Sequence, residues 1–199
     1  MRKILFFAIS MMAMTLFMNS CKTEKNGKGN DSDSLASDTA AVQTVKDTTM
    51  YGICGEGTSM HNLEFIRDNG DTLNIFIDEE EGSDVPGLQI VQGGLYAGDR
   101  MAVTAVKDVD GEFMAHRIIN LKTLEGKWSN RDMVNSTIEF VEDGTISATQ
   151  MGENGGYAAW HICNGNLVLS PDTFMILNLG ADSLELEGKK GISVFKRMK

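Results

Sequence analysis

Cysteine and proline are scarce in this 199-residue chain, which has three cysteines and two prolines. Three cysteines are too few for a disulfide scaffold. Cys54 and Cys163 stand 109 positions apart, and they can pair only if their Cα atoms approach within about 7 Å. Two separate thiols are favoured, because free cysteine is usually buried. Pro86 and Pro171 fall in segments that we expect to be loops.

Recognisable catalytic motifs are also missing. The sequence has no Gly-x-Ser-x-Gly, no His-Glu-x-x-His, no phosphate-binding loop and no local Cys–His constellation. We therefore expect a protein that is not an enzyme and that carries no cofactor.

Metal ligands are sparse in the sequence. His161 and Cys163 share one face of an expected strand and supply half a metal site, whereas a structural site needs about four ligands. The acidic run Asp78–Glu81 has no EF-hand spacing, so a solvated loop is favoured over a Ca²⁺ site. We expect no bound metal.

Positive charge is in the minority. The whole chain has a net charge of −10, and residues 46–121 carry 5 basic and 14 acidic side chains, a net charge of −9. Residues 122–199 carry 8 basic and 10 acidic side chains, a net charge of −2. An acidic surface repels phosphate backbones and anionic lipid headgroups, so we expect neither nucleic acid nor direct headgroup binding.

The one long apolar run, from Ile4 to Met18, follows Arg2 and Lys3. This layout predicts a secretory signal over residues 1–20 and is too short for a spanning helix. Ser20-Cys21 resembles the lipobox of bacterial lipoproteins, although Met18 and Asn19 are looser matches to it. The resemblance implies that Cys21 is lipidated, with acyl chains such as palmitate, and becomes the mature N-terminus. Two or more chains would anchor the protein firmly in a membrane.

Residues 21–46 are rich in Ser, Asp, Asn, Gly and Lys and nearly devoid of large apolar side chains. Such a segment cannot bury enough surface to offset its ordering entropy, so we expect a disordered tether. We expect the protein in the cell envelope. By resemblance to other lipoproteins, this is the outer membrane, on its periplasmic face or at the cell surface.

After residue 46 no window sustains a helical period for about ten residues, and hairpin-turn dipeptides recur, which predicts an all-β fold. The segment 85–92 could hold one short helical turn. Residues 47–121 form one expected domain of five strands with a long insertion after the third, which resembles an OB-type barrel. The expected strands of this domain are Met50–Glu56, Asn62–Arg67, Thr72–Ile77, Arg100–Lys107 and Phe113–Asn120.

Residues 122–199 contain eight expected short strands, among them Tyr157–Cys163, and eight is the number at which an up-and-down sheet closes into a barrel. Gly126-Lys127-Trp128 and Arg197 resemble the lipocalin-like, or calycin-like, family of small bacterial barrels found as C-terminal modules of envelope lipoproteins. The resemblance implies that Arg197 packs across the indole of Trp128 and closes one end of the barrel. Because an expected strand ends at Asn120 and the next begins at Gly126, no flexible linker fits between the domains.

Lipocalins carry apolar ligands, but an eight-stranded barrel with bulky inward side chains is more easily filled than hollow. A filled interior is therefore favoured. In the hollow alternative, Trp160 and Phe140 are the candidate ligand-facing residues. The leading hypothesis is a non-enzymatic, lipid-anchored module that binds or assembles with an envelope protein or a glycan. The alternative is a carrier of a small apolar ligand in the second barrel.

Overall fold

The computed structural model describes residues 46–79, 87–133, 135–149 and 156–199. Residues 44–199 form one compact unit. The predicted signal segment, the lipidation residue Cys21 and all of the predicted tether except its last residue lie outside the described residues. Within the described part, no helix is both long and apolar enough to cross a membrane.

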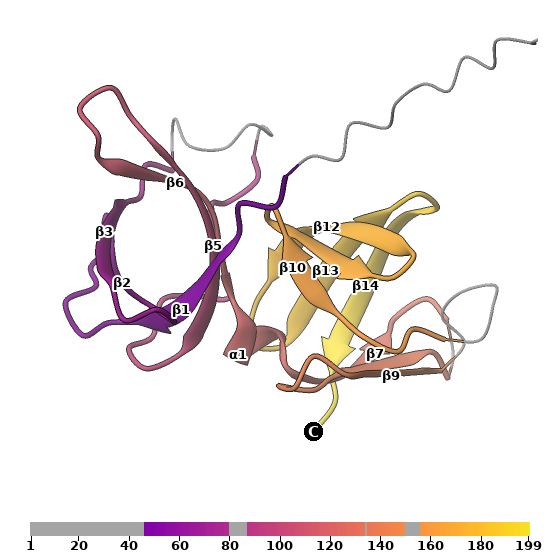
Figure 1. Cartoon of the computed structure of the whole chain (residues 1–199). Coiled ribbons are helices and arrows are strands. Elements are labelled where there is room, and N and C mark those ends of the chain that lie inside the picture. Colours follow the sequence, from indigo (N-terminus) through magenta and orange to yellow (C-terminus); the bar gives the residue numbers. More distant parts are fainter. Residues whose placement is uncertain (1–45, 80–86, 134, 150–155) are drawn as a thin grey trace, which may run out of the picture. The chain divides into compact units, whose positions relative to one another are not determined.

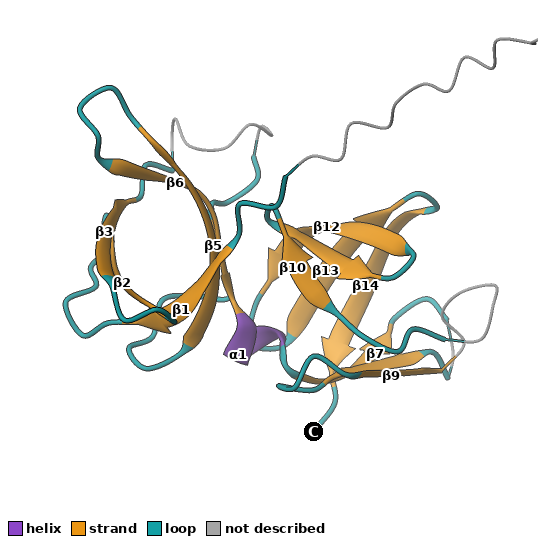
Figure 2. Ribbon diagram, in the orientation of Figure 1, coloured by secondary structure: helices purple, strands orange, loops and turns teal. Residues whose placement is uncertain are grey.

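The all-β prediction is confirmed, and the strands form two sheets (Figures 1 and 2). The first, sheet A, is a closed OB-like barrel of five strands, in which β3 and β6 run parallel and the other neighbours antiparallel. A sixth, two-residue strand pairs with β6. The strands of sheet A are β1 (Met50–Cys54), β2 (Asn62–Arg67), β3 (Thr72–Phe76), β4 (Val91–Gln92), β5 (Arg100–Lys107) and β6 (Phe113–Asn120).

The core of barrel A comes from alternation along its strands. Leu63 and Phe65 of β2 are fully buried, as is Ile75 of β3, whereas Ile66 and Phe76 beside them are exposed. A strand turns successive side chains to opposite faces, so one face of each strand fills the barrel. Cys54 belongs to this core, and its thiol is free.

The insertion between β3 and β5 contains a strand that the sequence did not predict. The short β4 pairs parallel with β6, opposite Ile118 and Ile119, in a segment that could have held one helical turn. Ile90 is fully buried just before it, and its carbonyl accepts a hydrogen bond from the amide of Ile118. Burial against β6 therefore makes this segment extended, a long-range effect that no local pattern encodes.

A single helical turn, α1 (Leu121–Leu124), connects the two sheets. Asn120 caps it by accepting a hydrogen bond from the amide of Thr123, and Leu121 and Leu124 are buried. Strand β6 ends at Asn120 and the next strand begins at Gly126, as predicted. The junction is thus a capped turn with two buried leucines.

The second sheet, sheet B, has eight antiparallel strands in the order β10-β11-β12-β13-β14-β7-β8-β9. The C-terminal strand pairs with the first one, as in an up-and-down barrel. These strands are β7 (Gly126–Asn130), β8 (Thr137–Phe140), β9 (Ile146–Thr149), β10 (His161–Cys163), β11 (Asn166–Leu169), β12 (Asp172–Leu179), β13 (Ser183–Gly188) and β14 (Gly191–Arg197).

Sheet B curls into a half-barrel, in contrast to the fully closed barrel expected from the sequence. Strands β9 and β10 share no ladder in the described part of the chain; an isolated bridge joins Thr145 to Ala159. The expected strand Tyr157–Cys163 contributes only its last three residues to β10. The open seam of sheet B therefore lies between its two edge strands, β9 and β10.

One apolar core fills the curl of sheet B and extends to sheet A. Trp128, Phe140, Trp160 and Phe195 are its large aromatic members, and all are buried. Ala102 of β5 and Ile119 of β6 belong to the same cluster. Apolar burial is therefore continuous across the junction.

Candidate functional site

A cleft of about 700 Å³ opens on barrel A where β3 ends. The end of β3, the loop before β2, the insertion between β3 and β5, and the start of β6 each contribute to its walls. Its lining is mostly apolar and includes two methionines and a phenylalanine. The lining residues are Met60, His61, Phe76, Ile77, Asp78, Glu79, Val91, Leu95 and Met114.

The apolar side chains of the cleft stand on a rigid frame. Phe76 pairs with Asn62 on one side and with Met114 on the other, so both neighbouring strands hold its backbone. The amide of Ile77 donates to the carbonyl of His61 at 3.0 Å, which ties the loop before β2 to the end of β3. The cleft therefore exists without any partner.

Phe76 and Met60 are exposed although they are large and apolar. Phe76 is 47% exposed and Met60 is 82% exposed. The neighbours of Phe76 in β3 and after it, Ile75 and Ile77, are buried, so the alternation of the strand directs Phe76 to the outer face. Both side chains line the same cleft, and exposed apolar side chains that share one surface mark binding sites more often than isolated ones do.

Carboxylates form one lip of the cleft. Asp78 and Glu79 follow directly after Ile77. One oxygen of Glu79 accepts a hydrogen bond of 3.0 Å from the amide of Ile90, which fixes the carboxylate against the insertion. A negative charge is thus held beside an apolar floor, an arrangement suited to a ligand that is both cationic and apolar.

The three residues predicted to close the second barrel lie together at the junction. Trp128 is fully buried, and its indole N–H donates to the carbonyl of Leu124 at 2.9 Å. The guanidinium of Arg197 lies 4.1 Å from the centre of the Trp128 ring. Gly126 has a φ of 108°, and a Cβ there would lie 2.8 Å from a guanidinium nitrogen of Arg197. Only glycine fits this position without a shift of Arg197.

Arg197 also binds the backbone around the junction. Its guanidinium donates to the carbonyl oxygens of Thr123, Glu125 and Ala181. Partial burial lowers the pKa of Arg197, and the charge of Asp182 opposes that effect. These contacts hold α1, the start of β7 and the β12–β13 turn in one place.

The two candidate ligand-facing residues pack against each other. The rings of Phe140 and Trp160 meet edge to face, with centroids 5.6 Å apart. Both are buried, and the indole N–H of Trp160 donates to the carbonyl of Val141 at 2.9 Å. The inner face of sheet B is occupied by the chain's own side chains.

His161 and Cys163 lie together on β10, as predicted, but the described residues contain no group of three or more His, Cys, Asp and Glu side chains able to hold a metal. The thiol of Cys163 is free. Burial and the neighbouring charge of Asp47 raise its pKa, so this thiol is a weak nucleophile at neutral pH. The acidic run Asp78–Glu81 lies only in part within the described residues.

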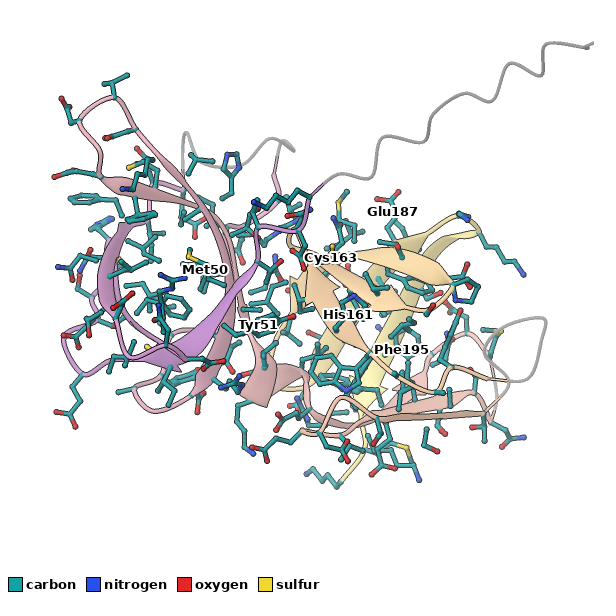
Figure 3. All side chains as sticks on the ribbon, viewed as in Figure 1. Met50, Tyr51, His161, Cys163, Glu187 and Phe195 are labelled. Atoms are coloured by element: carbon teal, nitrogen blue, oxygen red, sulfur yellow. The ribbon has the colours of Figure 1, made fainter. Side chains whose placement is uncertain are left out.

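The polar contacts between the two sheets have no counterpart among the sequence-based predictions. The hydroxyl of Tyr51 donates to the carbonyl of Ile162 at 2.7 Å and accepts from its amide at 3.2 Å, which caps the free edge of β10. Figure 3 shows Tyr51 of β1 beside the strand that carries His161 and Cys163.

Gln92 makes a second tie between the sheets, because its side-chain oxygen accepts from the amide of Leu179 at 2.8 Å. Gln92 is nearly completely buried, as is Asn120 at the junction. The sequence signal that could have pointed to these contacts is an amide side chain within an apolar stretch, because such a side chain needs hydrogen-bond partners when it is buried. The cleft has a similar signal in Phe76, an aromatic residue at an outward strand position.

Comparison of the chain with protein-family models, with curated proteins and with solved structures gave no match to any of them. The functional argument therefore rests on the geometry of the chain itself.

Proposed function

We propose that this protein is a non-enzymatic, lipid-anchored module of the cell envelope that binds another envelope component through the cleft of barrel A. The observation that carries the proposal is the exposure of Met60 and Phe76 in a preformed cleft of about 700 Å³. Ligand sites in proteins are concave, largely preformed and mostly apolar, with a few polar groups at fixed positions.

The other parts of the proposal come from the sequence. The signal layout and Ser20-Cys21 support secretion and acylation, which leave the folded part joined to the membrane by a tether. The net charge of −9 over residues 46–121 weighs against nucleic acid and against anionic headgroups as occupants of the cleft. A protein or a glycan of the envelope remains as the class of partner.

The alternative, a carrier of a small apolar ligand inside the second barrel, finds less support. Phe140 and Trp160 contact each other and are buried. Trp128 and Phe195 fill the same core. A ligand inside the curl would have to displace these side chains, which already form one buried cluster.

The test of binding is site-specific photo-crosslinking in the cells that make the protein. A photoreactive phenylalanine analogue at position 76 should crosslink to one or a few discrete envelope components. The same analogue at Val109, which is fully exposed on the β5–β6 turn of the same barrel, is the matched control and should give none. Equal crosslinking from both positions, or none from position 76, would refute binding through the cleft.

The test of anchoring is cell fractionation. A Cys21→Ala chain should lose the acyl chains that anchor it, so a larger share of it should appear in the soluble fraction than of the unmodified chain. A Cys163→Ala chain is the matched control and should stay with the membrane. Retention of the Cys21→Ala chain in the membrane would contradict lipid anchoring at this residue.

A further inference from the structure

We infer that the occupant of the cleft is a basic, apolar peptide segment of a partner protein: a large apolar side chain on the floor, with a lysine or arginine against the acidic lip. This inference rests on the proposed function and narrows its partner class.

The floor of the cleft favours an apolar side chain. Met60, Phe76, Leu95 and Met114 come from four different segments of barrel A and line the same space. Methionine is unbranched and polarizable, so it adapts to aliphatic and aromatic partners alike. Burial of exposed Phe76 and Met60 by a partner removes apolar surface from water, which stabilises the complex.

The lip selects the charge of the partner. Asp78 and Glu79 are consecutive acidic residues at the end of β3, and the hydrogen bond from the amide of Ile90 fixes the Glu79 carboxylate. A preorganised carboxylate binds a cation without first losing side-chain entropy. The surrounding barrel, with a net charge of −9 over residues 46–121, attracts a basic segment and accelerates its association.

The charge and the lining of the cleft disfavour three other occupants: a second copy of the chain, an acidic peptide and a glycan. In a symmetric dimer through this face, the acidic lips of two identical copies would meet across the interface. Like charges that face each other at an interface oppose association. An acidic peptide meets the same repulsion. A glycan would find few hydrogen-bonding groups, since His61, Asp78 and Glu79 are the only polar side chains of the described lining.

The experiment measures fluorescence anisotropy of a labelled heptapeptide in which lysine alternates with leucine around a central phenylalanine. The protein is residues 22–199, which lack the apolar run Ile4–Met18 and Cys21 but keep the compact unit of residues 44–199, so that no detergent micelle competes for the peptide. Two control peptides separate the contributions: one has serine at all apolar positions, and the other has glutamate at all lysine positions. We expect binding in the micromolar range for the first peptide, and at least about tenfold weaker binding for each control.

Three protein variants locate the peptide. Phe76→Ser should weaken binding at least about tenfold, because truncation of a central aromatic contact removes much of the binding energy. Glu79→Gln keeps the acceptor for the amide of Ile90 and loses only the charge, so it should weaken binding about three- to tenfold, with a smaller effect at high salt. Val109→Ser changes an equally apolar exposed residue outside the cleft and should leave binding unchanged.

Several results would overturn the inference. If the serine control peptide bound as tightly as the basic apolar peptide, charge alone would explain the interaction. If the glutamate control peptide bound as tightly, the acidic lip would have no role in binding. Full binding by Phe76→Ser, or no binding of the basic apolar peptide at about 1 mM, would remove the cleft as its site. If position 76 nevertheless gives discrete crosslinks in cells, the proposed function stands and only the class of partner is wrong.

Discussion

Sheets A and B protect their edge strands in different ways. Barrel A closes on itself through the parallel pairing of β3 with β6, which leaves its five main strands without a free edge. Sheet B keeps two edge strands, β9 and β10. The hydroxyl of Tyr51 caps the backbone of β10 at Ile162, and the Thr145–Ala159 bridge joins the two edges at one point. Closure is intrinsic to the first sheet, whereas the second relies on a residue of the first.

The two sheets differ equally in what they expose. Residues 46–121 have a net charge of −9 and an apolar cleft, whereas residues 122–199 have a net charge of −2 and place their large aromatics in the core. Exposed apolar surface costs stability and solubility, so a fold keeps it where it is used. This difference is the reason why we propose binding for barrel A and structural support for sheet B.

The largest loss of stability should come from a substitution in the core of sheet B. Trp128→Ala removes a fully buried indole, its hydrogen bond to Leu124 and the ring beneath Arg197. We expect the free energy of unfolding to fall by about 3–5 kcal/mol, as in other large-to-small core substitutions. Denaturant unfolding, followed by circular dichroism and by the fluorescence of Trp160, measures it.

The matched control for Trp128 is Ile192→Ala, because Ile192 is an exposed apolar residue of β14 in the same sheet. It should change the free energy of unfolding by less than about 0.5 kcal/mol. A loss below about 1 kcal/mol for Trp128→Ala would show that the indole does not support the core.

The junction should give the next largest effect. Asn120 is fully buried; its side chain accepts from the amide of Thr123 and donates to the carbonyl of Gly94 and to the carboxylate of Asp99. Asn120→Ala leaves these groups without their partner. We expect a loss of about 2–3 kcal/mol, because unsatisfied buried groups incur their full desolvation cost.

Asn74→Ala is the matched control for the junction, since Asn74 is an exposed residue of β3. Its effect on denaturant unfolding should be within about 0.5 kcal/mol. Equal losses in the two variants would mean that the Asn120 network does not hold the sheets together.

The agreement between sequence and structure is greatest where the signals are local. The dipeptides Asn69-Gly70, Asp110-Gly111, Asp143-Gly144 and Asn164-Gly165 each lie at a hairpin turn, with the glycine at positive φ. Only a residue tolerant of positive φ forms such turns at low cost. The turn dipeptides, together with the alternation of apolar and polar residues, therefore predicted the positions of most strands.

The features that the sequence did not predict depend on distant residues. Strand β4 is extended because it lies against β6, and α1 forms because Asn120 caps it while its leucines are buried. Sheet B stays a half-barrel because β9 and β10 share no ladder among the described residues, and an isolated bridge between Thr145 and Ala159 joins the two edges. The cleft unites four segments separated along the chain, so neither periodicity nor a motif marks it. Alternation places Phe76 on the outer face of β3, but only the fold brings it to one cleft with Met60 and Met114.

A smaller effect should appear at the protected edge of β10. Tyr51→Phe removes the hydroxyl that bonds to both backbone groups of Ile162. We expect a loss of about 1 kcal/mol in the free energy of unfolding, the usual net contribution of such a hydrogen bond. Hydrogen exchange at the amide of Ile162 should become faster than in the unmodified chain, since that amide loses its acceptor. Tyr96→Phe, an exposed tyrosine of barrel A, is the control and should leave both measurements unchanged.

The smallest expected effect is a change in the titration of Tyr157, which lies near the open seam of sheet B. Burial, together with a hydrogen bond to Asp172 and its charge, raises the pKa of this phenol from 10.0 to about 12. The folded state therefore favours the neutral phenol. Its contribution to stability is fully present below pH 10, the unfolded pKa, and is lost as the pH rises toward 12. An alkaline titration of phenolate absorbance should show a late-titrating tyrosine that disappears in Tyr157→Phe.

Asp172→Asn separates the two causes of the raised pKa of Tyr157. Because burial is the larger cause, this variant should lower the pKa only part of the way toward 10.0. A complete return to the ordinary value would show that the phenol is open to water and that the pairing of Tyr157 with Phe174, edge to face at 6.3 Å, does not shield it. The seam of sheet B would then be wetter than its packing implies, and the contrast with closed barrel A would be sharper.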